Sequence, residues 1–287
     1  MSEAIIKYGI LSDLPNGFEK LSDPAFLDLV REWKVTKDTL DPDLVETFRE
    51  RVCREWACET GQVEGLYTLD ADVMQGIIEN GLNSVDLSRQ PRGLLISSLY
   101  GVLEDQLGVI HSLYKDIRFF RPLTPFTACA VHASFVANQE FAIGLLYTGH
   151  QVRVKIEKGV FKSVPNRVGN VECCPPEQVS HEMNQLCKMH EEHLRAGVPV
   201  DVAAAWLHRE IILIHPFQDG NGRTARALAS VEFIRAGLLP PVVTLAGVGA
   251  YIEALKAGNV GDLEPLARYL SGLVAKKTRE CIEFCRS

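Results

Sequence analysis

The sequence predicts an all-α fold, a helical bundle that carries a small β-hairpin flap. Apolar residues recur at helical spacing through most of the 287 residues, and glycines and prolines separate the periodic stretches. Only the segment from Phe141 to Val171 differs, because it combines four glycines with alternating apolar and polar residues. A helical chain with one short β segment is typical of a bundle with an appended flap.

The helix patterns follow one another along the chain. Pro42 suits the first turn of a helix that begins near residue 43, and Gly65 suits the position just after its end. The expected helices cover 24–33, 43–64, 69–80, 96–114, 124–138, 176–196, 200–214, 223–236, 250–257 and 263–284.

Composition narrows the class of partner. The chain is 46% hydrophobic, which suffices for one sizeable core with appendages or for two small domains. Its net charge is −7 and it has no basic run, so nucleic acid is not an expected partner. The longest uncharged run, 236–252, is shorter than the roughly 20 residues that a membrane helix needs, so no membrane partner is expected either.

The eight cysteines show no zinc-binding spacing. The first residues do not form the apolar stretch of a secretory signal peptide. We therefore expect reduced thiols, mostly packed as small apolar groups, and a cytoplasmic location.

The chemistry is concentrated at residues 215–226, which read His-Pro-Phe-Gln-Asp-Gly-Asn-Gly-Arg-Thr-Ala-Arg. The apolar helix at 200–214 belongs in a core, and it delivers His215 to its end, where Pro216 stops it. The loop Asp219-Gly220-Asn221-Gly222 then allows positive φ and close backbone approach.

A new helix is expected to begin at Arg223, so its free N–H groups and positive dipole end make an anion site. Arg223 and Arg226 lie three residues apart, so both can reach one phosphate chain. Asp219 offers a hard oxygen ligand for Mg²⁺, and His215 suits a general base. This set favours phosphoryl or nucleotidyl transfer over the alternative, a helix–turn–helix corner with surface arginines.

The same twelve residues resemble the motif H-P-F-x-D/E-G-N-G-R-x-x-R of the Fic (filamentation induced by cAMP) family at every specified position. The resemblance extends from about Leu95 to Ala275. It implies a Fic-type helical bundle that transfers AMP from ATP to a Ser, Thr or Tyr hydroxyl of a protein, with Mg²⁺ or Mn²⁺ as cofactor.

The resemblance also assigns roles. His215 takes the proton from the attacking hydroxyl, Phe217 anchors the loop in the core, and Asp219 holds the cation. The phosphates would be bound by Gly220, Asn221, Gly222, Arg223 and Arg226, with Arg226 at the γ-phosphate.

A second family pattern, S/T-x-x-x-E-G/N, fits Thr60 to Gly65. It is similar to an inhibitory helix, here at about 43–65, which implies that Glu64 pairs with Arg226 and keeps ATP in an unproductive pose. A carboxylate is unfavourable at a helix C-terminus, and Gly61 weakens the last turn, so local preferences are overridden here. The alternative is an ordinary solvated glutamate.

Residues 159–171 resemble the family's flap, whose edge aligns a target segment by main-chain pairing. The target-docking residues would be Phe161, Lys162, Ser163, Val164 and Pro165. The alternative is a surface hairpin without a role.

Three further features outside these segments have a structural and a functional interpretation. The run His190-Glu191-Glu192-His193 lacks the spacing of a zinc helix and favours a solvated helix face. His208 favours a structural role. Tyr251 suits either an adenine pocket or core packing.

The expected organisation is an N-terminal helical region at 1–94, a catalytic core at 95–240, and C-terminal helices at 241–287. The partners implied are ATP and a protein with an exposed hydroxyl, which can be the chain itself; a homodimer stays open. De-AMPylation, transfer of UMP, and a non-enzymatic nucleotide-binding scaffold are the alternative functions.

Overall fold

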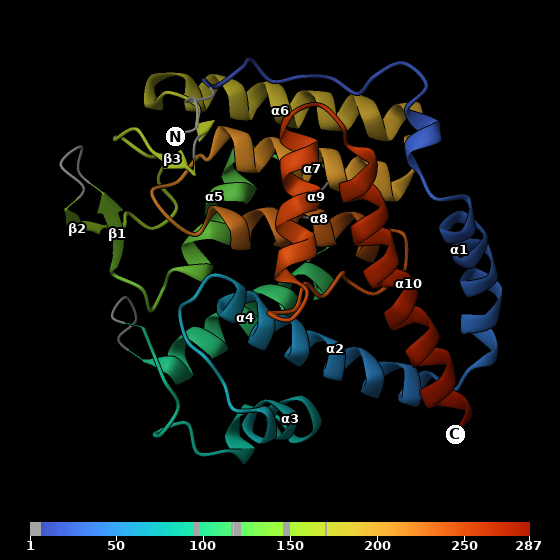
Figure 1. The fold of residues 1–287 in the computed structure, drawn as a ribbon. Helices are drawn as coiled ribbons and strands as arrows, with labels where there is room; N and C mark the ends of the chain where they lie inside the picture. The colour runs from blue at the N-terminus through green and yellow to red at the C-terminus, as the bar shows by residue number, and fades with distance from the viewer. Residues whose placement is uncertain (1–6, 94–97, 116, 118–121, 146–149, 170) are drawn as a thin grey trace.

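The computed structural model describes residues 7–93, 98–115, 117, 122–145, 150–169 and 171–287. It is a helical bundle with two short antiparallel hairpins at one side (Figure 1). The predicted fold class is therefore confirmed. The expected helix start at 96 and the expected boundary at 94–95 lie outside the described residues.

The helices match the sequence periodicity closely. The α-helices are α1 (Pro24–Thr36), α2 (Pro42–Val63), α3 (Ala71–Asn80), α4 (Leu99–Lys115), α5 (Pro125–Phe135), α6 (Pro176–Ala196), α7 (Val200–Ile214), α8 (Asn221–Arg235), α9 (Val248–Asn259) and α10 (Glu264–Arg286). Within the described residues, the 3₁₀ helix η1 (Phe18–Leu21) precedes α1, η2 (Lys37–Thr39) follows α1, and η3 (Leu82–Ser84) follows α3.

Local capping explains several of these bounds. The Asp41 carboxylate accepts the backbone N–H of Asp43 at the start of α2, where Pro42 occupies the first turn. Thr124 and Thr127 form a reciprocal capping box at the start of α5. Gly197, at φ 71°, ends α6 in the left-handed conformation.

The β structure is a pair of two-stranded sheets. Strand β1 (Phe141–Leu145) pairs with β2 (Gln151–Lys155), with Phe141 opposite Lys155. Strand β3 (Arg167–Val168) pairs with β4 (Val171–Glu172). The hairpin with the strand-like alternation therefore precedes the expected flap at 159–171, of which only the last part is paired.

The core is centred on α7 and α8, which pack against each other and are buried along nearly their whole length. Around them lie α1, α2, α4, α5, α6 and α10 (Figure 1). A second cluster joins α3 and η3 to α2 and α4. Because the twelve-residue segment links the two most buried helices, the fold holds its backbone on several sides.

The N-terminal segment crosses α6 and α7 (Figure 1). The Tyr8 hydroxyl donates to Glu182, and the Ser12 carbonyl accepts the Trp206 indole N–H at 2.8 Å. Within the described residues, no helix is long and apolar enough to cross a membrane.

Candidate active site

His215 ends α7 in the left-handed conformation, at φ 50° and ψ 60°. Among the described residues it is the only non-glycine residue with positive φ, and such strained backbone persists only where the surroundings enforce it. Its Nδ1 lies 3.2 Å from the Ile212 carbonyl, which can only accept, so Nδ1 carries the hydrogen. The lone pair on Nε2 is then free to accept a proton.

The imidazole of His215 is neutral at neutral pH. Burial, followed by the positive charge of Lys162, lowers the pKa of His215 to about 4, against the opposing effects of Asp219 and Glu64. A neutral imidazole with a free Nε2 has the protonation state of a base.

Two residues from the expected flap hold the backbone around His215. The Lys162 ammonium donates to the Ile214 carbonyl at 3.2 Å, and its backbone N–H donates to the Pro216 carbonyl at 2.8 Å. The Asn166 amide donates to the Phe217 carbonyl at 3.0 Å and accepts from the Lys162 ammonium. The segment therefore fixes three carbonyls of the turn in which His215 is strained.

This position corrects one part of the docking prediction. Lys162 is only 4% exposed and points inward, because its ammonium satisfies the carbonyl at the C-terminus of α7. Phe161 is half-buried against Phe217. Ser163, Val164 and Pro165 are exposed, so only these three of the five predicted residues present a free surface.

The loop between α7 and α8 is closed by its own side chains. Asn221 accepts the Phe217 backbone N–H and donates to the Phe217 carbonyl, both at 2.8 Å. Phe217 is fully buried and stacks on His132 with ring centroids 3.8 Å apart, which confirms its expected anchoring role. The Asn221 side chain is thus committed to loop closure, and only its backbone faces the expected phosphate site.

Helix α8 begins at Asn221, two residues before the expected start at Arg223. Gly220 precedes it at φ 76°, and the first backbone bond of the helix runs from Thr224 N–H to the Gly220 carbonyl. The N–H groups of the first turn therefore belong to 221–223, which places the helix N-terminus within the glycine loop. This arrangement suits an anion.

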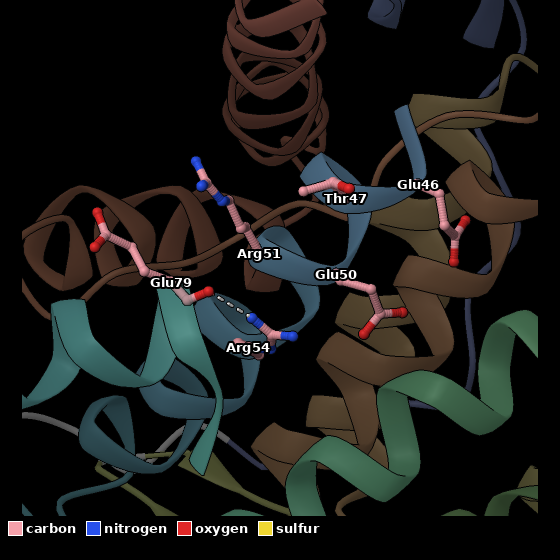
Figure 2. A pocket seen from close by; sticks show the side chains of 6 residues that line it. All are labelled: Glu46, Thr47, Glu50, Arg51, Arg54 and Glu79. Carbon is pink, nitrogen blue, oxygen red and sulfur yellow. Dashed lines mark hydrogen bonds between the residues drawn. The ribbon is translucent and has the colours of Figure 1, made fainter. Parts of the chain in front are cut away.

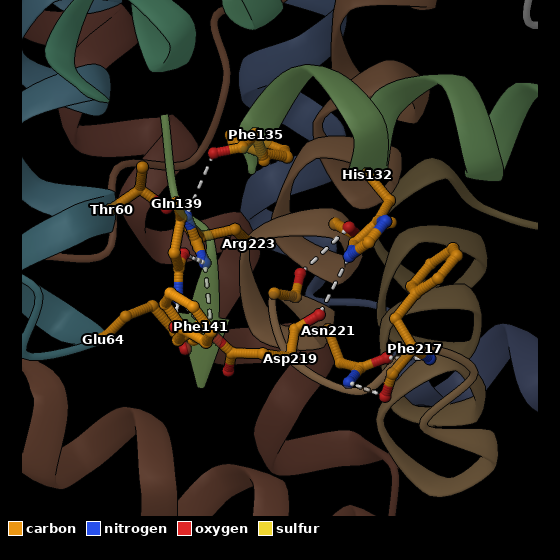
Figure 3. A network of polar contacts seen from close by, with 12 residues as sticks. Thr60, Glu64, His132, Phe135, Gln139, Phe141, Phe217, Asp219, Asn221 and Arg223 are labelled. Atoms are coloured by element: carbon orange, nitrogen blue, oxygen red, sulfur yellow. Dashed lines mark hydrogen bonds and ion pairs between the residues drawn. The ribbon is translucent and has the colours of Figure 1, made fainter. Parts of the chain in front are cut away.

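The two arginines of the segment turn to different neighbours. Arg223 is fully buried and donates to the Gln139 amide oxygen at 2.6 Å and to the Phe135 carbonyl at 3.2 Å (Figure 3). Arg226 instead reaches α2. The two guanidinium groups thus have separate protein partners in this structure, and the prediction that both reach one phosphate chain stays a prediction.

Arg226 is held by the end of α2. It donates to the Thr60 hydroxyl and carbonyl, both at 3.0 Å, and to the Glu64 carboxylate at 2.8 Å. Burial by itself lowers the pKa of Arg226, but the adjacent Glu64 carboxylate outweighs it and raises that pKa. The predicted Glu64–Arg226 pair is present.

The Glu64 carboxylate also lies on the glycine loop itself. A Cβ at Gly222 would come within 2.4 Å of Glu64 Oε1 and 3.2 Å of Arg226 Nη1. Gly222 therefore leaves the space that the carboxylate occupies. An acidic group from α2 thus sits at the anion-binding N-terminus of α8.

Asp219 fits a single-carboxylate cation site. Its side chain is 32% exposed, and its Oδ2 accepts from the Gln139 amide at 2.6 Å. The described residues contain no group of three or more His, Cys, Asp or Glu side chains arranged to hold a metal ion. Asp219 would therefore hold Mg²⁺ or Mn²⁺ together with phosphate oxygens and water, which matches the preference of Mg²⁺.

Tyr251 and His208 lie behind Arg226 in the core. Tyr251 is 4% exposed, and its hydroxyl lies 2.8 Å from His208 Nε2. Burial lowers the pKa of His208 to about 3, and the charge of Arg226 adds to the effect. Core packing, one of the two alternatives for Tyr251, is what the structure shows, and His208 is structural as expected.

The prediction of a solvated face at 190–193 is wrong for both histidines. His190 is buried against Glu232, and His193 is buried against Trp206 with its Nε2 2.7 Å from Asp13. They lie three residues apart on the inner stripe of α6, which places Glu191 and Glu192 toward solvent.

A charged pocket of about 230 Å³ lies between α2 and α3, lined by Glu46, Thr47, Glu50, Arg51, Arg54 and Glu79 (Figure 2). Arg54 donates to the Ile78 and Glu79 carbonyls at its base. None of the predicted site residues lines this pocket.

Two site residues were not found from the sequence. His132 lies under the loop, with Nε2 3.0 Å from the Asp219 carbonyl and Nδ1 accepting the Gly159 N–H (Figure 3). Gln139 contacts both Asp219 and Arg223. His132 lies in the last turn of α5, and Gln139 lies just after that helix. Both precede the motif by more than seventy residues, and no local sequence pattern distinguishes them.

Part of this chain, including the segment 215–226, is similar in sequence to known proteins. The Fic/DOC family model matches residues 122–232. A relative named "Protein adenylyltransferase fic-1" from Caenorhabditis briggsae is 32% identical over 117 residues, which cover 40% of this chain and 23% of the relative. "Protein adenylyltransferase Fic" from Drosophila ananassae is 32% identical over 152 residues, covering 51% of this chain and 30% of the relative. The matched part thus spans less than a third of either relative.

The fold is shared over nearly the whole chain. A Fic domain containing signaling protein from Bacteroides thetaiotaomicron superposes with a TM-score of 0.73 at 22% identity, covering 91% of this chain and 96% of that one. Residues 134–508 of Fic-1 from C. elegans give a TM-score of 0.70 at 19% identity, covering 93% of this chain and 71% of that one. The motif, the family match and the shared fold lead to one conclusion: residues 122–232 of this chain form a Fic/DOC family domain.

Proposed function

We propose that this chain transfers AMP from ATP to a hydroxyl group of a protein, and that Glu64 restrains the reaction. The observation that carries the proposal is the segment 215–226. It sets a neutral imidazole beside a helix N-terminus, and a carboxylate from α2 lies on that N-terminus. The names of the curated relatives support the same activity.

The reaction follows from the position of His215. Its Nε2 accepts the proton of the target hydroxyl as the hydroxyl oxygen attacks the α-phosphorus of ATP. A phosphorus–oxygen bond forms there, the bond to the β-phosphate oxygen breaks, and pyrophosphate leaves. The strained turn, held by Lys162 and Asn166, keeps the imidazole in one orientation.

The glycine loop supplies the phosphate site. The backbone N–H groups at 221–223 bind phosphate oxygens, and Asp219 would hold the divalent cation, which neutralises charge on the phosphates. Arg226 binds the γ-phosphate once it leaves Glu64. Arg223 stays buried and supports the wall of the site.

Glu64 restrains the reaction because it competes with the γ-phosphate of ATP for the guanidinium group of Arg226. Glu64 and Arg226 approach to 2.8 Å with little solvent around the guanidinium, so this pair is stronger than an exposed one. The same carboxylate lies at Gly222, where it repels phosphate. ATP then binds without its productive γ-phosphate contact.

The target surface is the exposed strip Ser163–Pro165, which leads into β3. Its backbone aligns a segment that carries the accepting hydroxyl, and main-chain pairing selects shape more than sequence. A loop of this chain itself is also a candidate target.

The test compares the wild type with Glu64→Gly, using ATP and Mg²⁺ and mass spectrometry of all modified proteins. We expect AMP on the chain itself or on lysate proteins, with more in the variant than in the wild type. His215→Ala in the same background should abolish it. Equal labelling by wild type and Glu64→Gly would reject the restraint.

The same measurement separates the alternatives. A UMP increment would assign another nucleotide, and loss of AMP from a pre-modified target would assign the reverse hydrolysis. Labelling that survives His215→Ala would reject the catalytic assignment, and nucleotide binding with no modification of any kind would favour a non-enzymatic scaffold.

A further inference from the structure

Gln139 lies between the two charged residues of the loop. Its amide nitrogen donates to Asp219 Oδ2, and its amide oxygen accepts from Arg223 Nη2, each at 2.6 Å (Figure 3). Gln139 is fully buried, just beyond the end of α5 and outside the twelve-residue segment. Its amide nitrogen also lies 3.3 Å from the Phe141 carbonyl, which fixes the orientation of the amide.

The direct contact between the two charges is weaker than either contact to the amide. Arg223 Nη2 and Asp219 Oδ2 are 3.6 Å apart, beyond normal hydrogen-bond distance. A side-chain amide can donate to a carboxylate and accept from a guanidinium while carrying no charge itself. Gln139 therefore satisfies both groups without neutralising either of them.

Among the described residues, Gln139 makes the one side-chain hydrogen bond to the Asp219 carboxylate, and Arg223 lies near it at 3.6 Å. His132 holds the Asp219 backbone carbonyl, and the Phe135 carbonyl holds the other arm of Arg223. The carboxylate itself faces the loop and is partly exposed. The hydrogen bond from Gln139 is thus the shorter of the two contacts that orient this carboxylate.

We propose that Gln139 is a positioning residue that keeps Asp219 and Arg223 from closing to hydrogen-bond distance, so that the carboxylate stays available to a divalent cation. This inference rests on the proposed function, because it takes Asp219 as the cation ligand of a nucleotide site. It assigns to Gln139 the role of an outer partner that orients a metal ligand.

Replacement of Gln139 by methionine removes both hydrogen bonds at nearly the same volume. Asp219 and Arg223 then pair directly, and the carboxylate is withdrawn from the cation. Gln139→Glu keeps the shape but places a second carboxylate beside Asp219, which strengthens binding of the cation alone.

The experiment measures ATP binding by titration calorimetry, in EDTA and in Mg²⁺, on full-length Glu64→Gly protein with each variant. The dissociation constant of ATP in EDTA, divided by that in Mg²⁺, reports how strongly the cation assists ATP binding. We expect this ratio to fall at least about tenfold in Gln139→Met, as for other outer partners of metal ligands. Mn²⁺ binding without nucleotide, followed by electron paramagnetic resonance, should strengthen in Gln139→Glu.

Gln178→Glu, an exposed position on α6, is the control for the added charge and should leave both values unchanged. If Gln139→Met does not fold, the isosteric Gln139→Glu carries the test. Folded variants that keep the parent ratio and the parent Mn²⁺ binding would overturn the role of Gln139. If the Glu64→Gly parent itself shows no cation-assisted ATP binding, the proposed function fails instead.

Discussion

At the scale of single residues, the site is shaped by polar groups whose partners lie in the core. Lys162 directs its ammonium at the end of α7, and Gln139 divides its amide between two charges. A buried polar group without a partner costs about 1–3 kcal/mol, so each of these contacts fixes a geometry strongly. The turn around His215 and the loop after it are therefore held by buried side chains from outside residues 215–226.

His208 shows how burial makes the fold sensitive to acid. It faces Tyr251 and the charge of Arg226, and its pKa is lowered from 6.5 to about 3. Because the unfolded chain binds the proton more readily, stability rises with pH between these two values and is lost as pH falls below 6.5.

We predict that His208→Gln reduces this acid sensitivity. Glutamine can still accept from the Tyr251 hydroxyl but does not titrate. The wild type should lose roughly 1.4 kcal/mol more per pH unit than the variant between pH 6.5 and 4.5. Urea unfolding at several pH values measures both slopes, and parallel slopes would contradict the assignment.

At the scale of elements, α2 is positioned by a close contact at its last turn. The sequence suggested that Gly61 merely weakens this helix, but the structure gives another reason. A Cβ at Gly61 would come within 2.4 Å of the Tyr67 hydroxyl oxygen. This hydroxyl has three acceptors within hydrogen-bond distance, which are the Ala57 carbonyl, the Cys58 carbonyl and the Gln106 amide oxygen. Gly61 thus allows the chain after α2 to fold back and seat Glu64.

We predict that Gly61→Ala destabilises the protein by about 1–3 kcal/mol, because the added methyl forces Tyr67 out of its place. Displacing the turn should also raise automodification. Gly272→Ala is the matched control, since α10 is open at that position and alanine should add about 0.5–1 kcal/mol there. Chemical denaturation measures both changes, and a neutral Gly61→Ala would show that the turn adjusts freely.

The elements themselves were largely predictable. Helices α6 and α7 have the expected bounds, because each is amphipathic or apolar over many turns and ends at proline, glycine or His215. The β segment was placed less well, since two short hairpins share one glycine-rich stretch and register depends on distant neighbours. The histidines of α6 were misassigned because charged neighbours in sequence face the opposite side of the helix.

At the scale of the whole molecule, one contact between α2 and α8 joins the N-terminal region to the catalytic loop. Arg226 is buried and donates hydrogen bonds to Thr60 and Glu64, which lie more than 160 residues earlier in the chain. In the proposed reaction, nucleotide binding and the packing of α2 are therefore thermodynamically linked, because both use Arg226 and the space at Gly222.

We predict that Glu64→Ala lowers the melting temperature of the free protein but increases the shift produced by ATP and Mg²⁺. Loss of the carboxylate leaves Arg226 without its ionic partner, at a cost of about 1–3 kcal/mol in stability. The same change vacates the space at Gly222 and frees Arg226 for phosphate, so ATP should bind more tightly. Differential scanning calorimetry with and without ATP measures both effects. Glu32→Ala, at an exposed position on α1, is the control, and equal ATP shifts in wild type and Glu64→Ala would contradict the linkage.

The sequence by itself determined the helical class, the positions of most helices and the motif at residues 215–226, because periodicity, caps and loop glycines act over a few neighbouring residues. Only the tertiary structure decided that Lys162 points inward, that the two arginines diverge, and that Gln139 stands between Asp219 and Arg223. Those choices depend on which surfaces pack together and on which buried polar groups find partners, and neither is set by spacing along the chain.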